Sequence, residues 1–146
     1  MRITKRTNIA IRVLMYCATH PAKLVTKSEI AHSCNVSENH LAQVIHQLSQ
    51  LDYLFTQRGR NGGLRLARSA EQINVGHVFR DIEGALPIVE CFRGPGNTCP
   101  LISACRLKAA LAVASQAFYA HLDTITLGEL VWDNGALGDL LGRVDA

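Results

Sequence analysis

The sequence predicts a mainly α-helical chain that contains one small β-hairpin. Apolar residues recur at helical spacing through most of the first 51 residues and again between residues 103 and 122. Two short segments of strand-like residues flank the glycine-rich stretch RGRNGG. The length of 146 residues suits one domain with a modest core, since domains commonly run to about 100–150 residues.

The first predicted helix covers residues 3–19. Its apolar face carries residues at helical spacing: Ala10, Val13, Leu14 and Cys17. We interpret Cys17 as a packing residue, because free cysteine is commonly buried as a small hydrophobe. The same interpretation applies to Cys34, which ends the next predicted helix.

Two further helices are expected on either side of a tight turn. Thr26 and Glu29 have the spacing of a capping box that opens a short second helix. Asn35 follows it and tolerates the left-handed backbone that a tight turn requires. Ser37 is expected to cap the third helix. The apolar residues of that helix form one continuous stripe: Leu41, Val44, Ile45, Leu48 and Leu51.

A β-hairpin is expected next, with strands at about residues 53–57 and 64–67. Asn61 and Gly62 between them are expected to supply the positive φ angles of the hairpin turn. Helix, tight turn, helix and basic hairpin follow one another in the order of a winged helix-turn-helix. The sequence therefore predicts that fold for the first half of the chain.

The second half is expected to be helical with a loose end. Residues 73–84 form a further helix or half-helix, and residues 103–122 form the longest helix. One side of the longest helix carries its large apolar residues: Leu107, Leu111, Phe118 and Leu122, with Ala114 among them. The segment TLGELV makes a last short helical turn, and the glycine-rich tail beyond Asn134 is expected to be flexible.

The charge of the chain is unevenly distributed. Residues 1–70 hold ten Lys and Arg against three Asp and Glu, a net charge of +7. Residues 71–146 hold five against nine, a net charge of −4. A basic half joined to an acidic half indicates that the first half meets a polyanion, although a solvated basic face is an alternative.

The third helix and the hairpin supply residues suited to double-stranded DNA. Asn and Gln offer paired donors and acceptors that match base edges in the major groove, and the first turn of a recognition helix usually reaches the bases. A serine at a helix start suits a phosphate, and arginines at a thin turn suit a minor groove or phosphates. The expected DNA-binding residues are Ser37, Asn39, His40, Gln43, Arg58, Arg60 and Asn61.

Cys91, Cys99 and Cys105 lie in the stretch ECFRGPGNTCPLISAC, with seven and five residues between them. A thiolate is a soft ligand suited to zinc, copper(I) or iron–sulfur clusters. Three thiolates leave a four-ligand site one short. A zinc knuckle and redox-active thiols are the alternatives. The chain start has no signal-peptide pattern and no membrane-length apolar run, so we expect a cytoplasmic protein whose cysteines stay reduced.

The longest helix is the expected dimer element. Winged-helix proteins commonly pair to read two half-sites. Small residues that permit close helix approach recur along this helix: Ala104, Ala109, Ala110, Ala112, Ala114, Ala117 and Ala120. The alternative is that the helix covers its own domain.

The quoted segments resemble a known family over about residues 1–132. VSENHLAQVIHQLSQLDYLFTQRGRNGGLRLA, ACRLKAAL and the three cysteines are similar to the iron–sulfur winged-helix transcription repressors. NHLAQVIHQLSQ, RGRNGG and ACRLKAAL are most similar to the nitric-oxide sensors named NsrR, whereas TKRTNIAIRVLMYCA and the cysteine spacing are similar to the iron sensors named RirA. The resemblance implies that Cys91, Cys99 and Cys105 bind a cluster, [4Fe–4S] ahead of [2Fe–2S], in each subunit of a homodimer.

The resemblance leaves the fourth cluster ligand open. In NsrR-like proteins an aspartate early in the first helix of the partner subunit completes the cluster, and the matching position here is Asn8, a neutral amide. The histidine that IscR-type members carry three residues after the last cysteine is replaced by Lys108. His77, Glu90 and His121 are candidate substitutes.

The predicted function is a repressor that senses nitric oxide through its cluster and releases operator DNA on nitrosylation. The alternative is a repressor that senses iron supply through cluster loss. No nucleophile–base set or paired-carboxylate pattern indicates an enzyme, although an electron-transfer enzyme and a zinc-bound DNA-binding protein remain competitors. The expected organisation is a DNA-binding region at 1–84, a cluster loop and dimerisation helix at 85–132, and a flexible tail at 133–146.

Overall fold

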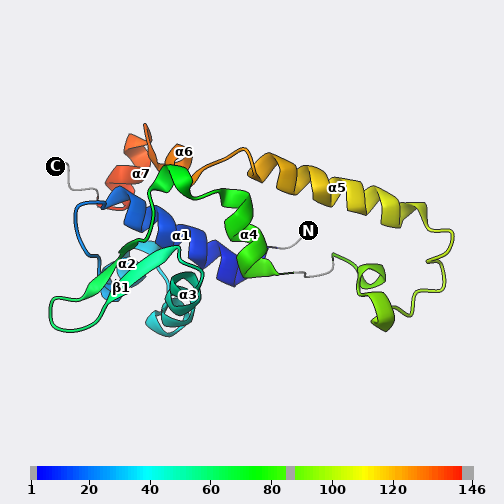
Figure 1. The fold of residues 1–146 in the computed structure, drawn as a ribbon, viewed down its shortest axis with the longest axis horizontal. Coiled ribbons are helices and arrows are strands. Elements are labelled where there is room, and N and C mark those ends of the chain that lie inside the picture. The colour runs from blue at the N-terminus through cyan, green and yellow to red at the C-terminus, as the bar shows by residue number, and fades with distance from the viewer. Residues whose placement is uncertain (1–2, 85–87, 143–146) are drawn as a thin grey trace.

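Helix α1 lies at the centre of the fold. The computed structural model describes residues 3–84 and 88–142. Its helices and strands are α1 Lys5–Thr19, α2 Lys27–Cys34, α3 Glu38–Gln50, β1 Leu54–Gln57, β2 Gly63–Leu66, α4 Val75–Glu83, α5 Arg106–Leu122, α6 Leu127–Val131 and α7 Gly135–Leu140. α1 contacts α2, α3, α4, α6 and β2. These elements and α7 form a head, from which residues 88–122 extend as a long arm (Figure 1).

The apolar stripe of α1 is buried as the sequence predicts. Ala10, Val13 and Leu14 are fully buried, and Cys17 is nearly so. The Thr4 hydroxyl caps the helix by accepting the backbone N–H of Thr7 at 3.3 Å. Other fully buried side chains of the core come from α2, α3, α6 and the segments between elements: Val25, Ile30, Leu41, Leu48, Ile73 and Leu127.

The helix-turn-helix forms through the local signals in its sequence. The Thr26 hydroxyl accepts the Glu29 N–H at 3.2 Å, and the Glu29 carboxylate accepts the Thr26 N–H at 2.6 Å, which completes the predicted capping box. Asn35 ends α2 with a left-handed φ of 50°. Ser37 caps α3, and the predicted stripe of that helix faces the core.

The wing is a two-stranded antiparallel hairpin in which Leu54 faces Leu66. The segment before α2 pairs with it, because Val25 and Leu64 exchange two backbone hydrogen bonds of 2.9 and 2.8 Å. Val25 is fully buried at this bridge. The hairpin is therefore fixed to the start of α2 as well as to its own strands.

The prediction for the hairpin turn is wrong in one respect. The positive φ angle falls on Gly59, at 104°, and not on Asn61 or Gly62. Gly62 is needed for a different reason: a Cβ there would lie 2.3 Å from the Gln57 carbonyl oxygen. The turn is longer than a two-residue turn, so its left-handed residue comes earlier in the RGRNGG stretch.

The end of the chain contains a helix that the sequence analysis does not predict. α7 forms where a flexible tail is expected, and the Asn134 side chain caps it by accepting the Leu137 N–H at 3.1 Å. A ring nitrogen of buried His20 lies 3.1 Å from the Gly142 carbonyl oxygen, which ties this segment to α1. Residues 143–146 of the predicted tail lie outside the described residues.

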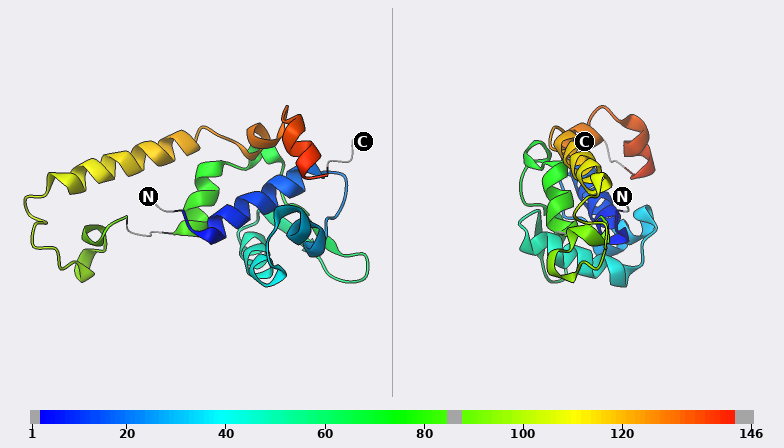
Figure 2. Two further views of the ribbon diagram at one scale, coloured as in Figure 1. Left: turned by 180° about the vertical axis from the view of Figure 1, so that it is seen from behind. Right: turned by 90° about the vertical axis from the view of Figure 1, so that its right-hand side faces the viewer.

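Helix α5 carries the arm away from the head, as the left view of Figure 2 shows. It begins at Arg106, with Cys105 as an extended N-cap, rather than at the predicted residue 103. Along its whole described length, Arg106–Leu122, none of its residues is buried. Within residues 3–84 and 88–142, no helix is both long and apolar enough to cross a membrane.

Candidate nucleic-acid interface and cysteine arm

The outer face of α3 presents the side chains expected to meet DNA. Leu41, Val44 and Leu48 face the core, which fixes the rotation of the helix. Asn39 and Gln43 are therefore exposed, and their spacing of four residues places them on one helical face. This face can offer amide donors and acceptors to base edges without a change in the core.

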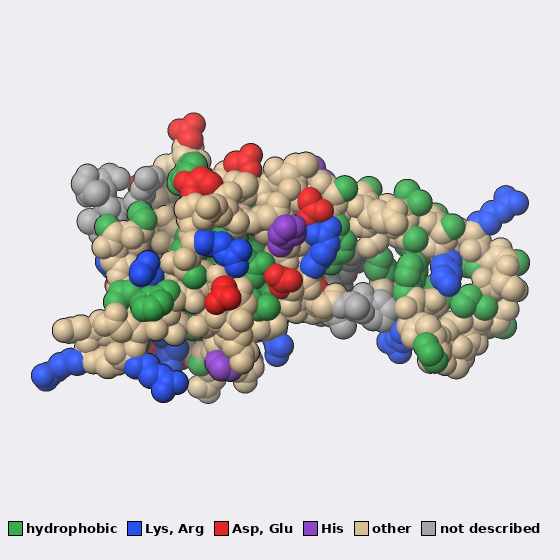
Figure 3. All heavy atoms as spheres, viewed as in Figure 1, with side chains coloured by type: hydrophobic (Ala, Val, Ile, Leu, Met, Phe, Trp, Pro, Cys, Tyr) green, Lys and Arg blue, Asp and Glu red, His purple; other side chains and the backbone are tan. Residues whose placement is uncertain are grey.

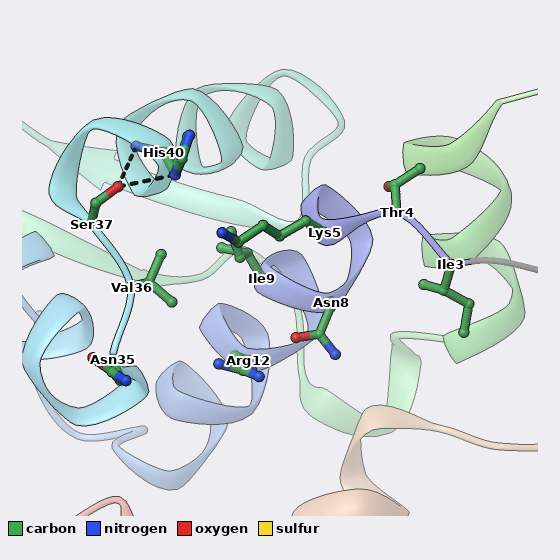
Figure 4. A pocket seen from close by; sticks show the side chains of 10 residues that line it. All are labelled: Ile3, Thr4, Lys5, Asn8, Ile9, Arg12, Asn35, Val36, Ser37 and His40. Atoms are coloured by element: carbon green, nitrogen blue, oxygen red, sulfur yellow. Dashed lines mark hydrogen bonds between the residues drawn. The ribbon is translucent and has the colours of Figure 1, made fainter.

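The predicted phosphate-binding residue at the start of α3 already has a structural role. The Ser37 hydroxyl accepts the His40 backbone N–H at 3.4 Å and lies 3.0 Å from the His40 ring nitrogen Nδ1 (Figure 4). Both contacts of the hydroxyl are therefore made with His40. Contact of Ser37 and His40 with DNA stays a prediction.

Arginines on the wing differ in how firmly they are held. The Arg65 guanidinium lies 4.8 Å from the centre of the Phe55 ring, and the Arg68 guanidinium lies 5.0 Å from that of Tyr53. Arg58 and Arg60, near the hairpin tip, are exposed and make no ion pair among the described residues. Lys and Arg side chains project from the wing end of the molecule in Figure 3. Arg58 and Arg60 are therefore the wing residues with freedom to reach a phosphate.

A groove of about 560 Å³ separates α3 from the wing. Lys27 from the first turn of α2, His46 from α3 and Arg58 from the wing line it. Sequence reasoning missed Lys27 as a residue of this groove, because its position depends on the pairing of Val25 with Leu64. The signal in the sequence that could have indicated this is the position of Lys27 directly after Thr26, the N-cap of α2.

A second and larger cavity, of about 840 Å³, lies between α1 and the start of α3. Asn8 lines it together with Lys5 and Arg12 from α1 and with His40 from α3, and Lys5 extends toward the turn that begins α3 (Figure 4). Arg12 donates from Nη1 to the Cys34 carbonyl oxygen at 3.0 Å, which closes the end of α2. The structure thus places Asn8 on the same cavity as the start of the predicted recognition helix.

The three clustered cysteines lie in the segment of the arm that precedes α5. Cys91 belongs to a short 3₁₀ turn, Cys99 lies in an irregular stretch, and Cys105 is the N-cap of α5. All three are half-buried and free of disulfide bonds. The Glu90 carboxylate accepts the Thr98 backbone N–H at 2.8 Å and also its hydroxyl, which joins the residues before Cys91 and Cys99.

These thiols fit a soft metal by chemistry but are not yet assembled around one point. No group of three or more Cys, His, Asp or Glu side chains within the described ranges, 3–84 and 88–142, is close enough to hold a metal ion. The donors themselves suit iron or zinc, since all three are free, partly accessible thiols on one segment. Binding a cluster would require that segment to bring its three sulfur atoms together.

Cys17 and Cys34 are packing residues, as predicted. Cys17 is 2% exposed, and burial raises the pKa of its thiol to about 12. Burial also raises the pKa of the Cys34 thiol. A metal binds the thiolate, so these two positions disfavour metal ligation.

The candidate fourth ligands differ in position. Glu90 adjoins Cys91, but its carboxylate is bound to Thr98, whose hydroxyl and N–H hold the pKa of Glu90 below its usual range. His121 lies near the head end of α5, about 24 Å from Cys105 by the rise of a helix. His77 is exposed in the first turn of α4. None of these placements assigns the ligand, which stays open.

Helix α4 connects the arm to the head. Its Arg80 forms a two-pronged ion pair with Asp123 at the end of α5, and its Glu83 accepts both the N–H and the hydroxyl of Thr4, at 2.7 and 3.0 Å. Close packing at Gly76 adds to the first of these joints, because a Cβ there would lie 2.0 Å from Asp123 Oδ1. A displacement of α5 can therefore pass through α4 to the beginning of α1.

Comparison with known proteins relates the chain to transcription regulators. Residues 3–133 match the Rrf2 model, described as an iron-dependent transcriptional regulator. The chain is 41% identical over 142 residues to the HTH-type transcriptional regulator NsrR of Geobacillus kaustophilus, which covers 97% of each chain. It is also 41% identical to Protein aau3 of Rhizobium meliloti, over 97% of this chain and 92% of that protein. The structure of T. potens IscR has a TM-score of 0.73 at 24% identity, covering 91% of this chain and 88% of that one, which supports the fold.

Proposed function

The chain belongs to the Rrf2 family of transcriptional regulators and is a DNA-binding regulator rather than an enzyme, and we propose that it is a homodimeric repressor whose cysteine arm senses nitric oxide through an iron–sulfur cluster. The observation that carries the proposal is the position of Cys91, Cys99 and Cys105. They are three free, half-buried thiols on one segment of an arm that is joined to the head by Arg80 and Asp123. A chemical change at the arm thus has a physical route to the DNA-binding head.

DNA binding would use two surfaces of the head. Asn39, His40 and Gln43 on α3 would enter the major groove, because their helix has its apolar stripe buried and this face exposed. Arg58, Arg60 and Asn61 on the wing, with Ser37, would bind phosphates or an adjoining minor groove. A phosphate contact positions the protein, whereas the contacts of α3 would select the operator.

Dimerisation would use the arm. Leu107 and Val113 of α5 are 63% and 64% exposed, and apolar side chains run along the arm in Figure 3. Helix α5 has 17 residues and is rich in alanine, which allows two helices to approach closely. A second copy of the chain would cover this apolar helix and place two recognition helices on two half-sites.

The thiolates of Cys91, Cys99 and Cys105 would hold the cofactor. An iron–sulfur cluster, when bound, supplies iron atoms that react with nitric oxide. The three thiolates would draw the arm segment into one arrangement while they are bound, and their release would free it. Arg80 and Asp123 would then pass a change in α5 to α4, and Glu83 would pass it to Thr4 and α1. The division of the chain into a DNA-binding region at 1–84, an arm at 85–132 and a tail stays a prediction.

Iron supply is a second candidate signal. Asn8 is a poorer iron ligand than the aspartate of NsrR-like proteins, and the family is described as iron-dependent. A cluster with one weak ligand would be lost readily when iron is scarce. Both candidates share the same cysteines and differ only in what the cluster responds to.

One experiment separates the two signals. The protein is purified without oxygen, bound to a duplex selected from a random pool, and titrated with nitric oxide or, separately, with an iron chelator. In the nitric oxide titration, we expect release of DNA at a few nitric oxide molecules per cluster. In the chelator titration, we expect the protein to stay bound to DNA until iron is removed. Release by the chelator alone, with nitric oxide ineffective, would support the iron sensor instead. A colourless protein that contains zinc and binds DNA would contradict both.

A further inference from the structure

Glu38 begins α3 and is bound by two residues from the start of α2. The Ser28 hydroxyl donates to Glu38 Oε1 at 2.9 Å, and Lys27 Nζ lies 3.2 Å from Glu38 Oε2. The hydrogen bond from Ser28 is the larger cause, and the contact with Lys27 the next, that holds the pKa of Glu38 below its usual range. The carboxylate is therefore ionised at neutral pH. An acidic side chain thus occupies the first turn of the helix that is expected to read DNA.

Lys27 belongs to the groove between α3 and the wing. It lines that groove of about 560 Å³ together with His46 and with Arg58, whose guanidinium carries a positive charge. A basic groove beside a recognition helix suits the phosphates of a DNA strand. Lys27 cannot give its full charge to a phosphate, however, while Glu38 is 3.2 Å away.

The ion pair is not needed to hold α2 and α3 together. Its side chains are 42% and 49% exposed, and an exposed pair contributes little to stability. The angle between the helices is already fixed by the left-handed turn at Asn35 and by the buried stripe of α3. The arrangement of Glu38 therefore has its main effect on charge at the DNA-binding surface.

We propose that Glu38 sets the sequence-independent part of the affinity for DNA by holding Lys27 in an ion pair that competes with phosphate. This inference rests on the proposed DNA-binding function and adds a residue that acts through Lys27 rather than on a base. Phosphate contacts contribute equally to operator and random DNA. Glu38 thus weakens both complexes, which keeps the repressor releasable when its signal arrives.

The test replaces Glu38 by glutamine in the full-length holoprotein. Glutamine keeps the shape and the acceptor for Ser28 but loses the charge that holds Lys27. We expect binding to a random duplex and to the selected duplex to tighten by a similar factor, about 3- to 10-fold near 0.1 M salt. The slope of log K against log salt concentration should steepen by about one unit, since one more phosphate contact forms.

Glu29→Gln is the matched control. It makes the same change in net charge on the neighbouring helix α2, and glutamine can still complete the capping box with Thr26. Glu29 pairs with Lys23 at 2.8 Å, and Lys23 is not among the residues of the groove. We expect the affinity for either duplex to change by less than about twofold, with an unchanged salt slope. Melting curves of both variants show that each is folded.

A double-mutant cycle tests whether Glu38 acts through Lys27. Lys27→Met should weaken binding of the parent protein less than that of the Glu38→Gln protein, in which it should return affinity and salt slope to parent values. Equal effects of Glu38→Gln and Glu29→Gln, or an equal effect of Lys27→Met in both backgrounds, would overturn the proposal. So would weaker binding of Glu38→Gln to the selected duplex alone, which would show that Glu38 reads a base. Failure of the parent protein to bind any duplex would instead overturn the proposed function.

Discussion

Arg80 in α4 and Asp123 at the end of α5 form a two-pronged ion pair, with Nη1–Oδ1 and Nη2–Oδ2 distances of 2.5 and 2.7 Å. The Arg80 guanidinium also lies 4.6 Å from the centre of the Tyr119 ring. These contacts join residues that are 43 positions apart and fix the arm at the point where it leaves the head. The joint is one place where a signal at the cysteines can pass from the arm to the head.

Arg80→Gln is therefore predicted to uncouple the arm from the head. Glutamine cannot form the paired contact with Asp123 or stack on Tyr119, so a displaced arm would move α4 less. Before nitric oxide is added, we expect normal iron content and normal DNA affinity. After it is added, the affinity of Arg80→Gln for DNA should fall by about fivefold or less, a smaller loss than in the parent protein. DNA-binding curves before and after treatment measure this. Lys23→Gln, which breaks a different exposed ion pair, should respond like the parent, and an identical response from Arg80→Gln would contradict the route through α4.

Gly76→Ala is predicted to destabilise the same joint by packing. A Cβ at Gly76 would lie 2.0 Å from Asp123 Oδ1 and 2.9 Å from the Asp123 backbone nitrogen, so the end of α5 must shift. Such overpacking costs about 1–3 kcal/mol. Thermal unfolding measures it, and Gly96→Ala is the control because a Cβ there meets nothing within 4 Å. Equal melting temperatures for Gly76→Ala and the parent would contradict this packing.

Arg60→Ala and Gln43→Ala are predicted to weaken DNA binding in different ways. Loss of a phosphate contact at Arg60 should lower affinity for all sequences and reduce the salt slope by about one unit. Loss of a base contact at Gln43 should cost about 1–3 kcal/mol on the selected duplex and relax its sequence preference. Binding to selected and random duplexes distinguishes the two. If both variants bound both duplexes like the parent, the docking of α3 and the wing would be wrong.

Cys17 is predicted to resist thiol reagents until the protein unfolds. Burial raises the pKa of its thiol from 9.0 to about 12, so almost no thiolate exists near pH 8 in the folded protein. The unfolded thiol ionises near 9, so Cys17 favours unfolding as the pH rises from about 9 toward 12, and has no such effect below that range. Alkylation followed by mass spectrometry should label Cys91, Cys99 and Cys105 in metal-free protein while Cys17 stays unmodified. Equal labelling of Cys17 would contradict its burial.

The sequence predicts the elements that depend on local chemistry. The capping box at Thr26, the left-handed turn at Asn35 and the cap at Ser37 each require only residues within a few positions, and all three are present. Burial of Cys17 follows from the period of its helix. These features can be predicted from sequence because the residues that interact are neighbours in the chain.

The features that sequence reasoning missed depend on distant partners or on loop length. α7 is tied to the head through His20 and Gly142, which are 122 positions apart. The turn of the wing places its positive φ at Gly59 because the loop is longer than the Asn61–Gly62 pattern indicates. The joint of Arg80 with Asp123 and the position of Lys27 in the groove likewise become visible only once the elements are packed.

Iron content per chain tests most directly whether the cysteine arm is the metal centre. Iron and sulfide are measured in anaerobically purified protein after single Cys→Ser changes at all five cysteines. We predict colourless, iron-free protein for Cys91, Cys99 and Cys105, and full iron for Cys17 and Cys34, whose thiols are buried. Full iron and sulfide after a change at Cys91, Cys99 or Cys105 would contradict the account.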